Sequence, residues 1–231
     1  MKSSDFAGDL LSISVAAALL ASCGGQQLAS PYVNPGSVGI SPGGVTSDGI
    51  APGYIKINFD VEAPLKFSKY QYLVILNTTG NGKTPEANSW VGYSFALETN
   101  RQSGVPSAKA VAFIKNRDPH VPPAQFIIGV TPQQFRFTAN SNRTGTEFTI
   151  LFQRSIFDSF EHGRKNSNWL FNAFANGKNG FVDSMGSCGS CFVSPKLSVD
   201  KAFDEKILAS AKPKGIEPSA KIVSVEFVNN P

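Results

Sequence analysis

Two cysteines whose spacing supports sulfur chemistry lie toward the C-terminal end of the chain, Cys188 and Cys191. A Cys-x-x-Cys motif can form a short disulfide, act as a thiol–disulfide redox centre, or supply two ligands of a zinc site. A redox centre favours a helix N-terminus at the first cysteine, whereas Gly and Ser flank both cysteines here. Zinc needs two further ligands, and the only histidines, His120 and His162, are isolated. We therefore predict a structural disulfide, with a thiol–disulfide redox role as the alternative.

Two other segments approach catalytic or phosphate-binding patterns without completing them. The segment 77–84 follows an apolar run, but Asn77 replaces the first glycine of G-x-x-x-x-G-K-[ST] and no helix pattern follows. Thr79 and Asn81 alternate with Asn77 like calcium ligands, yet none of the three is a carboxylate. The segment 92–96 lacks the last glycine of G-x-S-x-G. We expect a polar hairpin loop at 77–84, no catalytic residues, no metal site and no cofactor.

Three large aromatic residues are candidates for a binding platform: Trp90, Tyr93 and Trp169. Indole and phenol rings offer flat apolar faces on which a sugar ring can stack, although such residues more often pack in a core. The run 72–80, followed by 90–93, is similar to the start of extracellular sugar- or haem-binding β-sandwiches. That resemblance implies a carbohydrate-binding role as an alternative function.

Composition limits the classes of partner. The chain has 231 residues and a formal net charge of +4, and only 16% of its residues are charged. No cluster of Lys and Arg stands out, so we expect no nucleic-acid binding. Eighteen Phe residues supply apolar volume for a core. The length suits one domain and a linker.

An uncharged apolar run, Leu10 to Ser22, ends immediately before Cys23. As a helix its thirteen residues would rise about 20 Å, too short for a hydrocarbon core of about 30 Å. The length fits the apolar region of a signal peptide. Leu20-Ala21-Ser22-Cys23 resembles the lipobox of bacterial lipoproteins. The resemblance implies cleavage before Cys23, diacylglycerol on its sulfur, and, with Gly24 next, attachment to the outer membrane.

The rest of the chain divides into a tether and a body. Gly, Pro and Ser dominate residues 24–53, which predicts a flexible tether. We therefore expect a signal peptide at 1–22, a lipidated cysteine and tether at 23–53, and a folded domain at 54–231.

The folded domain shows strand patterns separated by Asn-Gly and Pro-Pro turns. Period-2 alternation or short apolar runs predict strands at 54–61, 70–76, 90–97, 110–114, 125–130, 134–138, 147–153, 169–174 and 221–228. Helix is expected only at 155–161 and 200–211. This pattern predicts an all-β fold, an antiparallel β-sandwich of immunoglobulin-like or jelly-roll-like type, with a closed barrel as the alternative.

Together these features predict a membrane-anchored envelope lipoprotein that presents a non-catalytic β-sandwich for binding or structure. Its lipid at Cys23 would hold the outer membrane, with the body facing the periplasm or the cell surface. The expected partner is another envelope protein or a polysaccharide. The alternatives are a periplasmic thiol–disulfide protein that uses Cys188 and Cys191, and a carbohydrate-binding sandwich.

Overall fold

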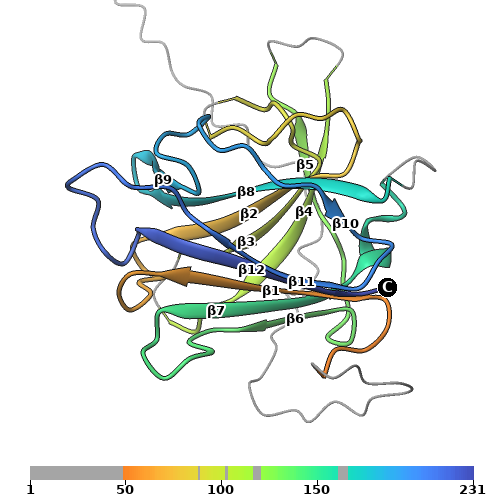
Figure 1. Ribbon diagram of the computed structural model, residues 1–231, viewed down its shortest axis with the longest axis horizontal. Helices are drawn as coiled ribbons and strands as arrows, with labels where there is room; N and C mark the ends of the chain where they lie inside the picture. Colours follow the sequence, from red (N-terminus) through yellow and green to blue (C-terminus); the bar gives the residue numbers. More distant parts are fainter. Residues whose placement is uncertain (1–48, 88, 102–103, 117–120, 161–165) are drawn as a thin grey trace, which may run out of the picture.

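Two antiparallel β-sheets packed face to face make up the folded body, as a computed structural model shows (Figure 1). The structure describes residues 49–87, 89–101, 104–116, 121–160 and 166–231. The prediction of an all-β antiparallel sandwich is confirmed. The expected signal peptide and most of the expected tether lie outside the described residues. Within the described part of the chain, no helix is long and apolar enough to cross a membrane.

One layer is a five-stranded sheet in which every neighbouring pair is antiparallel. Its strands, in spatial order, are β11 (Phe203–Leu208), β12 (Ile222–Asn230), β1 (Tyr54–Val61), β7 (Glu147–Gln153) and β6 (Phe135–Thr138). The alternating sequence of β1 produces this geometry, because side chains along a strand point to opposite faces in turn. Its apolar residues, from Ile55 to Val61, are all buried and the residues between them are half-buried.

The other layer is a seven-stranded antiparallel sheet. Six strands run in the order β10 (Leu197–Ser198), β8 (Asn168–Gly177), β2 (Gln71–Asn77), β3 (Phe95–Thr99), β4 (Ala108–Ile114) and β5 (Ala124–Ile127), and β9 (Gly180–Ser184) pairs with the far end of β8. Strand β2 is buried on both faces, as its continuous apolar run predicts.

Aromatic side chains fill the space between the two sheets. Phe59 of β1 stacks on Phe148 of β7 with ring centroids 4.8 Å apart. Phe95 of β3 stacks on Phe157 at 4.0 Å, and Phe157 belongs to the short 3₁₀ helix η1 (Arg154–Phe157) that follows β7. Tyr72 is fully buried, and its hydroxyl group donates a hydrogen bond to the Ser219 carbonyl at 2.8 Å. Truncating one such ring to alanine is expected to cost about 3–5 kcal/mol of folding free energy.

The expected helix at 200–211 is wrong. Residues 203–208 form the edge strand β11, which pairs with β12 from Phe203↔Asn229 to Leu208↔Ser224. The spacing of Phe203 and Ile207 does not separate the two structures, because four residues place side chains on one side of a helix and also on one face of a strand. Both pack partly against the core, whereas Leu208 at the end of the strand is 69% exposed.

The expected strand at 90–97 begins only at Phe95. Gly92 has φ +74°, and a Cβ atom there would lie 2.8 Å from the Lys83 carbonyl oxygen and 2.9 Å from the Pro85 nitrogen. A strand cannot continue through a left-handed residue at such close contact, so the chain turns at Gly92 instead. The short strands β9 and β10 were not predicted.

The described body starts slightly before Tyr54. Ile50 is buried, and its carbonyl oxygen accepts a hydrogen bond from the Asn230 side-chain amide at 2.8 Å. The Gly53 N–H donates to the Asn230 carbonyl at 2.6 Å. Residues 49–53, assigned to the tether from composition, therefore pack against the end of β12.

Candidate functional site

The outer face of the seven-stranded sheet, turned away from the other layer, carries a second, smaller apolar cluster. Its buried members are Leu73, Ile75, Tyr93, Ala96, Val111 and Phe174. Along β2, β3, β4 and β8 these residues alternate with residues of the main core, so they lie on the opposite side of the sheet. The loop that joins β2 to β3, residues 78–94, supplies Tyr93 to this cluster. Figure 1 shows this loop and the β4–β5 hairpin standing beyond the sheet on that side.

Polar contacts hold the β2–β3 loop in place. The buried Asn77 accepts hydrogen bonds from the Thr79 N–H at 3.1 Å and the Thr79 hydroxyl at 2.8 Å, so the segment 77–84 is a polar loop as predicted. Asn172 of β8, fully buried under the loop, donates from its amide to the Pro85 carbonyl at 2.8 Å. The Ala87 N–H donates to the Gly189 carbonyl at 3.0 Å. The loop is therefore fixed to the sheet and to the segment that contains both cysteines.

Two adjoining hollows lie beside the β2–β3 loop and the end of β4. The second opens between that loop and the β4–β5 hairpin, and the first extends to Phe95, Ala112 and Phe160 on the main-core side of the sheet. Their volumes are about 590 and 610 Å³, which is within the usual range of small-molecule sites. They share Asn81, Tyr93 and Lys115. The first is also lined by Thr78, Thr79, Ser94, Phe95, Ala112, Phe113, Ile114 and Phe160, and the second by Lys83, Ser89, Trp90, Val91, Gly92, Asn116, Val121 and Pro123. We call the two hollows together the outer groove.

Three aromatic rings pack together at the outer groove. Trp90 contacts Tyr93 edge-on with centroids 5.3 Å apart, and Tyr93 contacts Phe113 edge-on at 5.1 Å. Trp90 is 43% exposed, whereas Tyr93 is 9% exposed. Trp169 does not join them: it is 3% exposed in the main core, 5.8 Å from the ring of Phe157. Of the three candidate aromatic residues, Trp90 and Tyr93 therefore lie together, and Phe113 joins them in place of Trp169.

Buried hydroxyl groups line the first hollow without using their full hydrogen-bonding capacity. Thr78, Ser94 and Tyr93 are all at least nine-tenths buried. The Ser94 hydroxyl accepts a bond from the Thr78 N–H at 3.2 Å. Neither the Thr78 hydroxyl nor the Tyr93 hydroxyl bonds to any residue that the structure describes. Burial raises the pKa of Tyr93 well above its ordinary value, so the phenol stays protonated and able to donate. Buried polar groups without partners are rare and point to a bound molecule or water.

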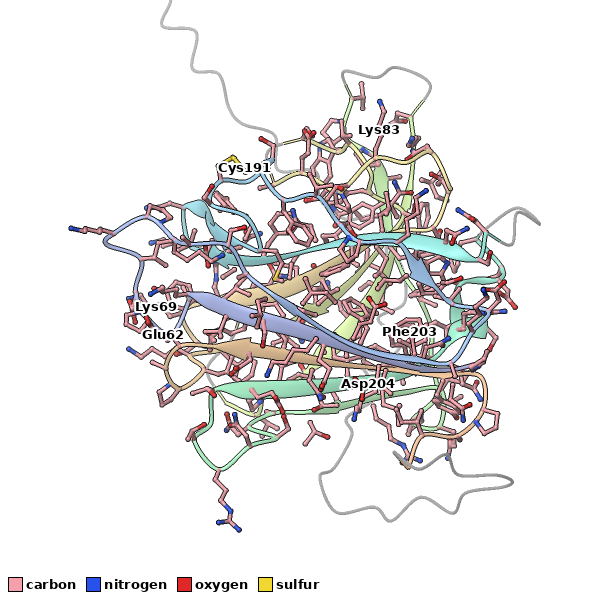
Figure 2. The ribbon with its side chains drawn as sticks, viewed as in Figure 1. Glu62, Lys69, Lys83, Cys191, Phe203 and Asp204 are labelled. Atoms are coloured by element: carbon pink, nitrogen blue, oxygen red, sulfur yellow. A yellow bond between two sulfur atoms is a disulfide. The ribbon has the colours of Figure 1, made fainter. Side chains whose placement is uncertain are left out.

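The charged side chains among the described residues that line the outer groove are all positive. Lys83 and Lys115 line it, and no described lining residue is Asp or Glu. Neither lysine forms an ion pair with a described residue. Figure 2 shows Lys83 at the top of the molecule, beyond the seven-stranded sheet. The Asn81 side-chain oxygen already accepts from the Asn77 amide at 2.7 Å, which leaves the Asn81 amide N–H groups as the donors that this side chain can offer to the groove.

Cys188 and Cys191 form the predicted disulfide, with their Cα atoms 5.1 Å apart. Both residues are exposed, in a turn between β9 and β10. The turn packs closely on the β2–β3 loop, since a Cβ atom on Gly189 would lie 2.6 Å from the Cβ of Ala87. No helix begins at Cys188, which removes one feature that lowers a thiol pKa in redox centres.

A buried ion pair lies next to the start of the disulfide turn. Asp183 and Lys212 have side chains that are each 3% exposed, with Nζ and Oδ2 3.2 Å apart. Asp183 also accepts from the Ile222 N–H at 2.8 Å, and Lys212 donates to the carbonyl oxygens of Ser184 and Gly186. Burial raises the pKa of Asp183 and lowers the pKa of Lys212, because each charge loses its hydration. The charged state of each side chain is therefore stabilised by the other charge and by these backbone hydrogen bonds.

Other sites considered from the sequence give no assembled centre in the described residues. No group of three or more His, Cys, Asp or Glu side chains is arranged to hold a metal ion there. His120 and His162 lie outside the described residues, and so does Cys23. A comparison with protein-family models, with curated proteins and with solved structures finds no match for this chain.

The meeting of segments 77–84 and 92–96 with the end of β4 in one groove was not predicted from the sequence. Phe113 and Lys115 come from β4 and the residue just beyond it, and Thr78 and Ser94 come from the two ends of the β2–β3 loop. The pairing of β3 with β4 brings these segments together, and the Phe113 N–H donates to the Ser94 carbonyl at 2.9 Å. Val111, Phe113 and Lys115 alternate along one face, and that parity was the available signal.

Proposed function

We propose that the protein is a lipid-anchored envelope protein whose β-sandwich binds carbohydrate, without catalysis, in the outer groove. The observation that carries the proposal is a half-exposed Trp90 that contacts Tyr93, in a groove whose buried Thr78 and Tyr93 hydroxyl groups lack described partners. A sugar has the complementary chemistry. Its C–H face stacks on an aromatic ring, and its hydroxyl groups both donate and accept hydrogen bonds. Such a ligand would satisfy the phenol and threonine groups that folding leaves unpaired.

The composition of the groove supports binding rather than turnover. Glycoside hydrolysis requires a pair of carboxyl groups on either side of the scissile bond. The described lining residues offer hydroxyl, amide and ammonium groups but no carboxyl, imidazole or thiol group. A hydroxyl nucleophile would also need a neighbouring base. The arrangement suits recognition of a polyhydroxylated ligand.

The location of the disulfide favours a structural role for Cys188 and Cys191. The Gly189 carbonyl between them accepts the Ala87 N–H, so the bridged turn supports the loop that carries Trp90. A thiol–disulfide enzyme would exchange near the glutathione potential, whereas a structural bridge would stay closed. Titrating free thiols across a series of glutathione redox buffers separates these two roles. We expect no free thiol at the glutathione potential.

The proposed anchor is diacylglycerol on Cys23, supported by the lipobox-like Leu20-Ala21-Ser22-Cys23. Labelling with a palmitate analogue in a bacterial host should mark the wild-type chain and leave Cys23→Ala unmarked. Cys188→Ala/Cys191→Ala, which keeps Cys23, should be labelled like the wild type. Equal labelling of wild type and Cys23→Ala would remove the anchor from the proposal. It would leave the binding site untouched.

Carbohydrate binding is tested by affinity electrophoresis of the mature chain through gels that contain one polysaccharide each, in a detergent without a sugar headgroup. A panel of neutral and acidic polymers covers the class. We expect retardation by at least one polymer, and loss of that retardation in Trp90→Ala. A matched control is Trp169→Phe, which alters a tryptophan of the core. Retardation that is equal in wild type and Trp90→Ala would contradict the proposed site.

A further inference from the structure

Two positively charged side chains, Lys83 and Lys115, line the outer groove, and their charge bears on which carbohydrate it binds. We infer that the groove takes an acidic saccharide, one whose sugar rings carry carboxylate or sulfate groups. This inference rests on the proposed carbohydrate-binding function and adds to it the charge of the ligand. The juxtaposition that carries it is an exposed indole, two buried hydroxyl groups without described partners, and two lysines.

The two lysines are available for a ligand. Lys83 and Lys115 are both exposed, and neither pairs with a carboxylate in the described part of the chain. Elsewhere in the same body, lysines near a carboxylate are paired: Lys109 lies 2.8 Å from Glu98, and Lys221 lies 2.9 Å from Glu62. The groove therefore keeps two positive charges without a described counter-charge.

Position within the groove gives each group a separate task. Lys115 and Tyr93 line both hollows, whereas Thr78 lines the first and Trp90 the second. Lys83 lines the second hollow alone, on the side of Trp90. A saccharide ring on Trp90 would present its anionic group to the lysines and its hydroxyl groups to the first hollow. Contact with the sugar ring and contact with its anionic group would then contribute separately to specificity.

Two matched pairs of polymers separate charge from sugar. Polygalacturonate and its methyl ester share one backbone and differ in free carboxylate, whereas dextran sulfate and dextran differ in sulfate. Polyglutamate supplies carboxylates without sugar. Dissociation constants come from Trp90 fluorescence of the mature chain at 50 mM and 500 mM NaCl. The variants are Lys83→Met/Lys115→Met and the control Lys206→Met, which changes an exposed lysine of β11 on the other sheet.

We expect one acidic polymer to bind about tenfold more tightly than its neutral partner at 50 mM salt, and that preference to shrink at 500 mM. The double lysine variant should lose the preference, and Lys206→Met should keep it. Which pair shows the preference identifies carboxylate or sulfate as the charge. Polyglutamate should bind at least tenfold more weakly than the preferred saccharide.

The remaining outcomes are distinct. Equal binding of acidic and neutral partners would overturn the acidic preference and leave carbohydrate binding standing. Equal binding of polyglutamate would show that charge alone is recognised, which overturns the saccharide. A preference that survives Lys83→Met/Lys115→Met would place the charge recognition elsewhere and overturn the inference. Absence of binding to all five polymers would also overturn it, while the wider polysaccharide panel would still test the proposed function separately.

Discussion

Replacing Asp183 with asparagine should destabilise the fold strongly, because it leaves the buried Lys212 ammonium without a counter-charge. The two side chains are each 3% exposed and 3.2 Å apart. The amide oxygen of the new side chain could still accept the Ile222 N–H bond, so the loss isolates the charge rather than the backbone contact. Removing one partner of a buried ion pair typically costs about 3–5 kcal/mol, and we expect a loss in that range at pH 7.

The pH dependence of that loss is specific to the lysine. Burial already lowers the pKa of Lys212 below its ordinary value of 10.5, and removing Asp183 should lower it further. A lysine whose folded pKa is lowered destabilises the fold fully below that pKa. The penalty fades as pH rises toward 10.5, where the unfolded chain also loses the proton. The difference in unfolding free energy between Asp183→Asn and wild type should therefore shrink from pH 7 to pH 10.

Urea denaturation, followed by emission of the buried Trp169, measures these free energies. The double variant Asp183→Asn/Lys212→Met removes both charges and should recover at least half of the loss, since no buried charge remains. A loss below about 1 kcal/mol at pH 7 would show that water or a shifted side chain solvates the ammonium. A loss that stays constant up to pH 10 would refute the assignment of the penalty to Lys212.

Three further predictions concern the loops around the sandwich. Glu217, whose pKa is lowered by hydrogen bonds first from Lys66, then Lys69 and others, should stabilise the fold fully above its ordinary value of 4.5; in acid denaturation the wild-type advantage over Glu217→Gln should begin to shrink as pH falls below 4.5 and vanish only well below it, at the lowered pKa. Gly92→Ala should cost about 1–3 kcal/mol in urea unfolding and more than Gly82→Ala, which shares the positive φ but meets no atom within 4 Å; equal losses would contradict the close contact at Gly92. Reducing the disulfide should lower stability by about 2 kcal/mol and weaken ligand binding through the β2–β3 loop, whereas an unchanged affinity would show that the turn does not support the groove.

The sequence predicts the sandwich well where local pattern and tertiary position agree. The alternation at β1 and the apolar run at β2 define a half-buried and a fully buried strand, and both are found. It fails at β11, because the spacing of Phe203 and Ile207 fits both periods and the free edge of β12 decides between them. Pairing with an available edge is a property of the assembled sheet, which local pattern does not contain.

In the groove, too, contacts between residues close in sequence were predictable, whereas contacts made by strand pairing were not. Trp90 and Tyr93 are close in sequence, so their association was predictable and is found. Phe113 and Lys115 join them through the pairing of β3 with β4, and Trp169 leaves them because its side chain points to the inner face of β8. The parity of a strand residue is readable from sequence, but which face becomes the groove depends on the β2–β3 loop that covers the sheet.

The central claim, that the outer groove holds the carbohydrate, is tested most directly by acrylamide quenching of tryptophan fluorescence. The chain has two tryptophans, and Trp90 is 43% exposed while Trp169 is 3% exposed. Acrylamide carries no charge, so it does not compete for the lysines. A polysaccharide that binds in the groove should protect the quenchable emission of the wild type, and Trp90→Phe should show neither that emission nor its protection. Binding of the same polysaccharide with Trp90 still fully quenchable would contradict the claim.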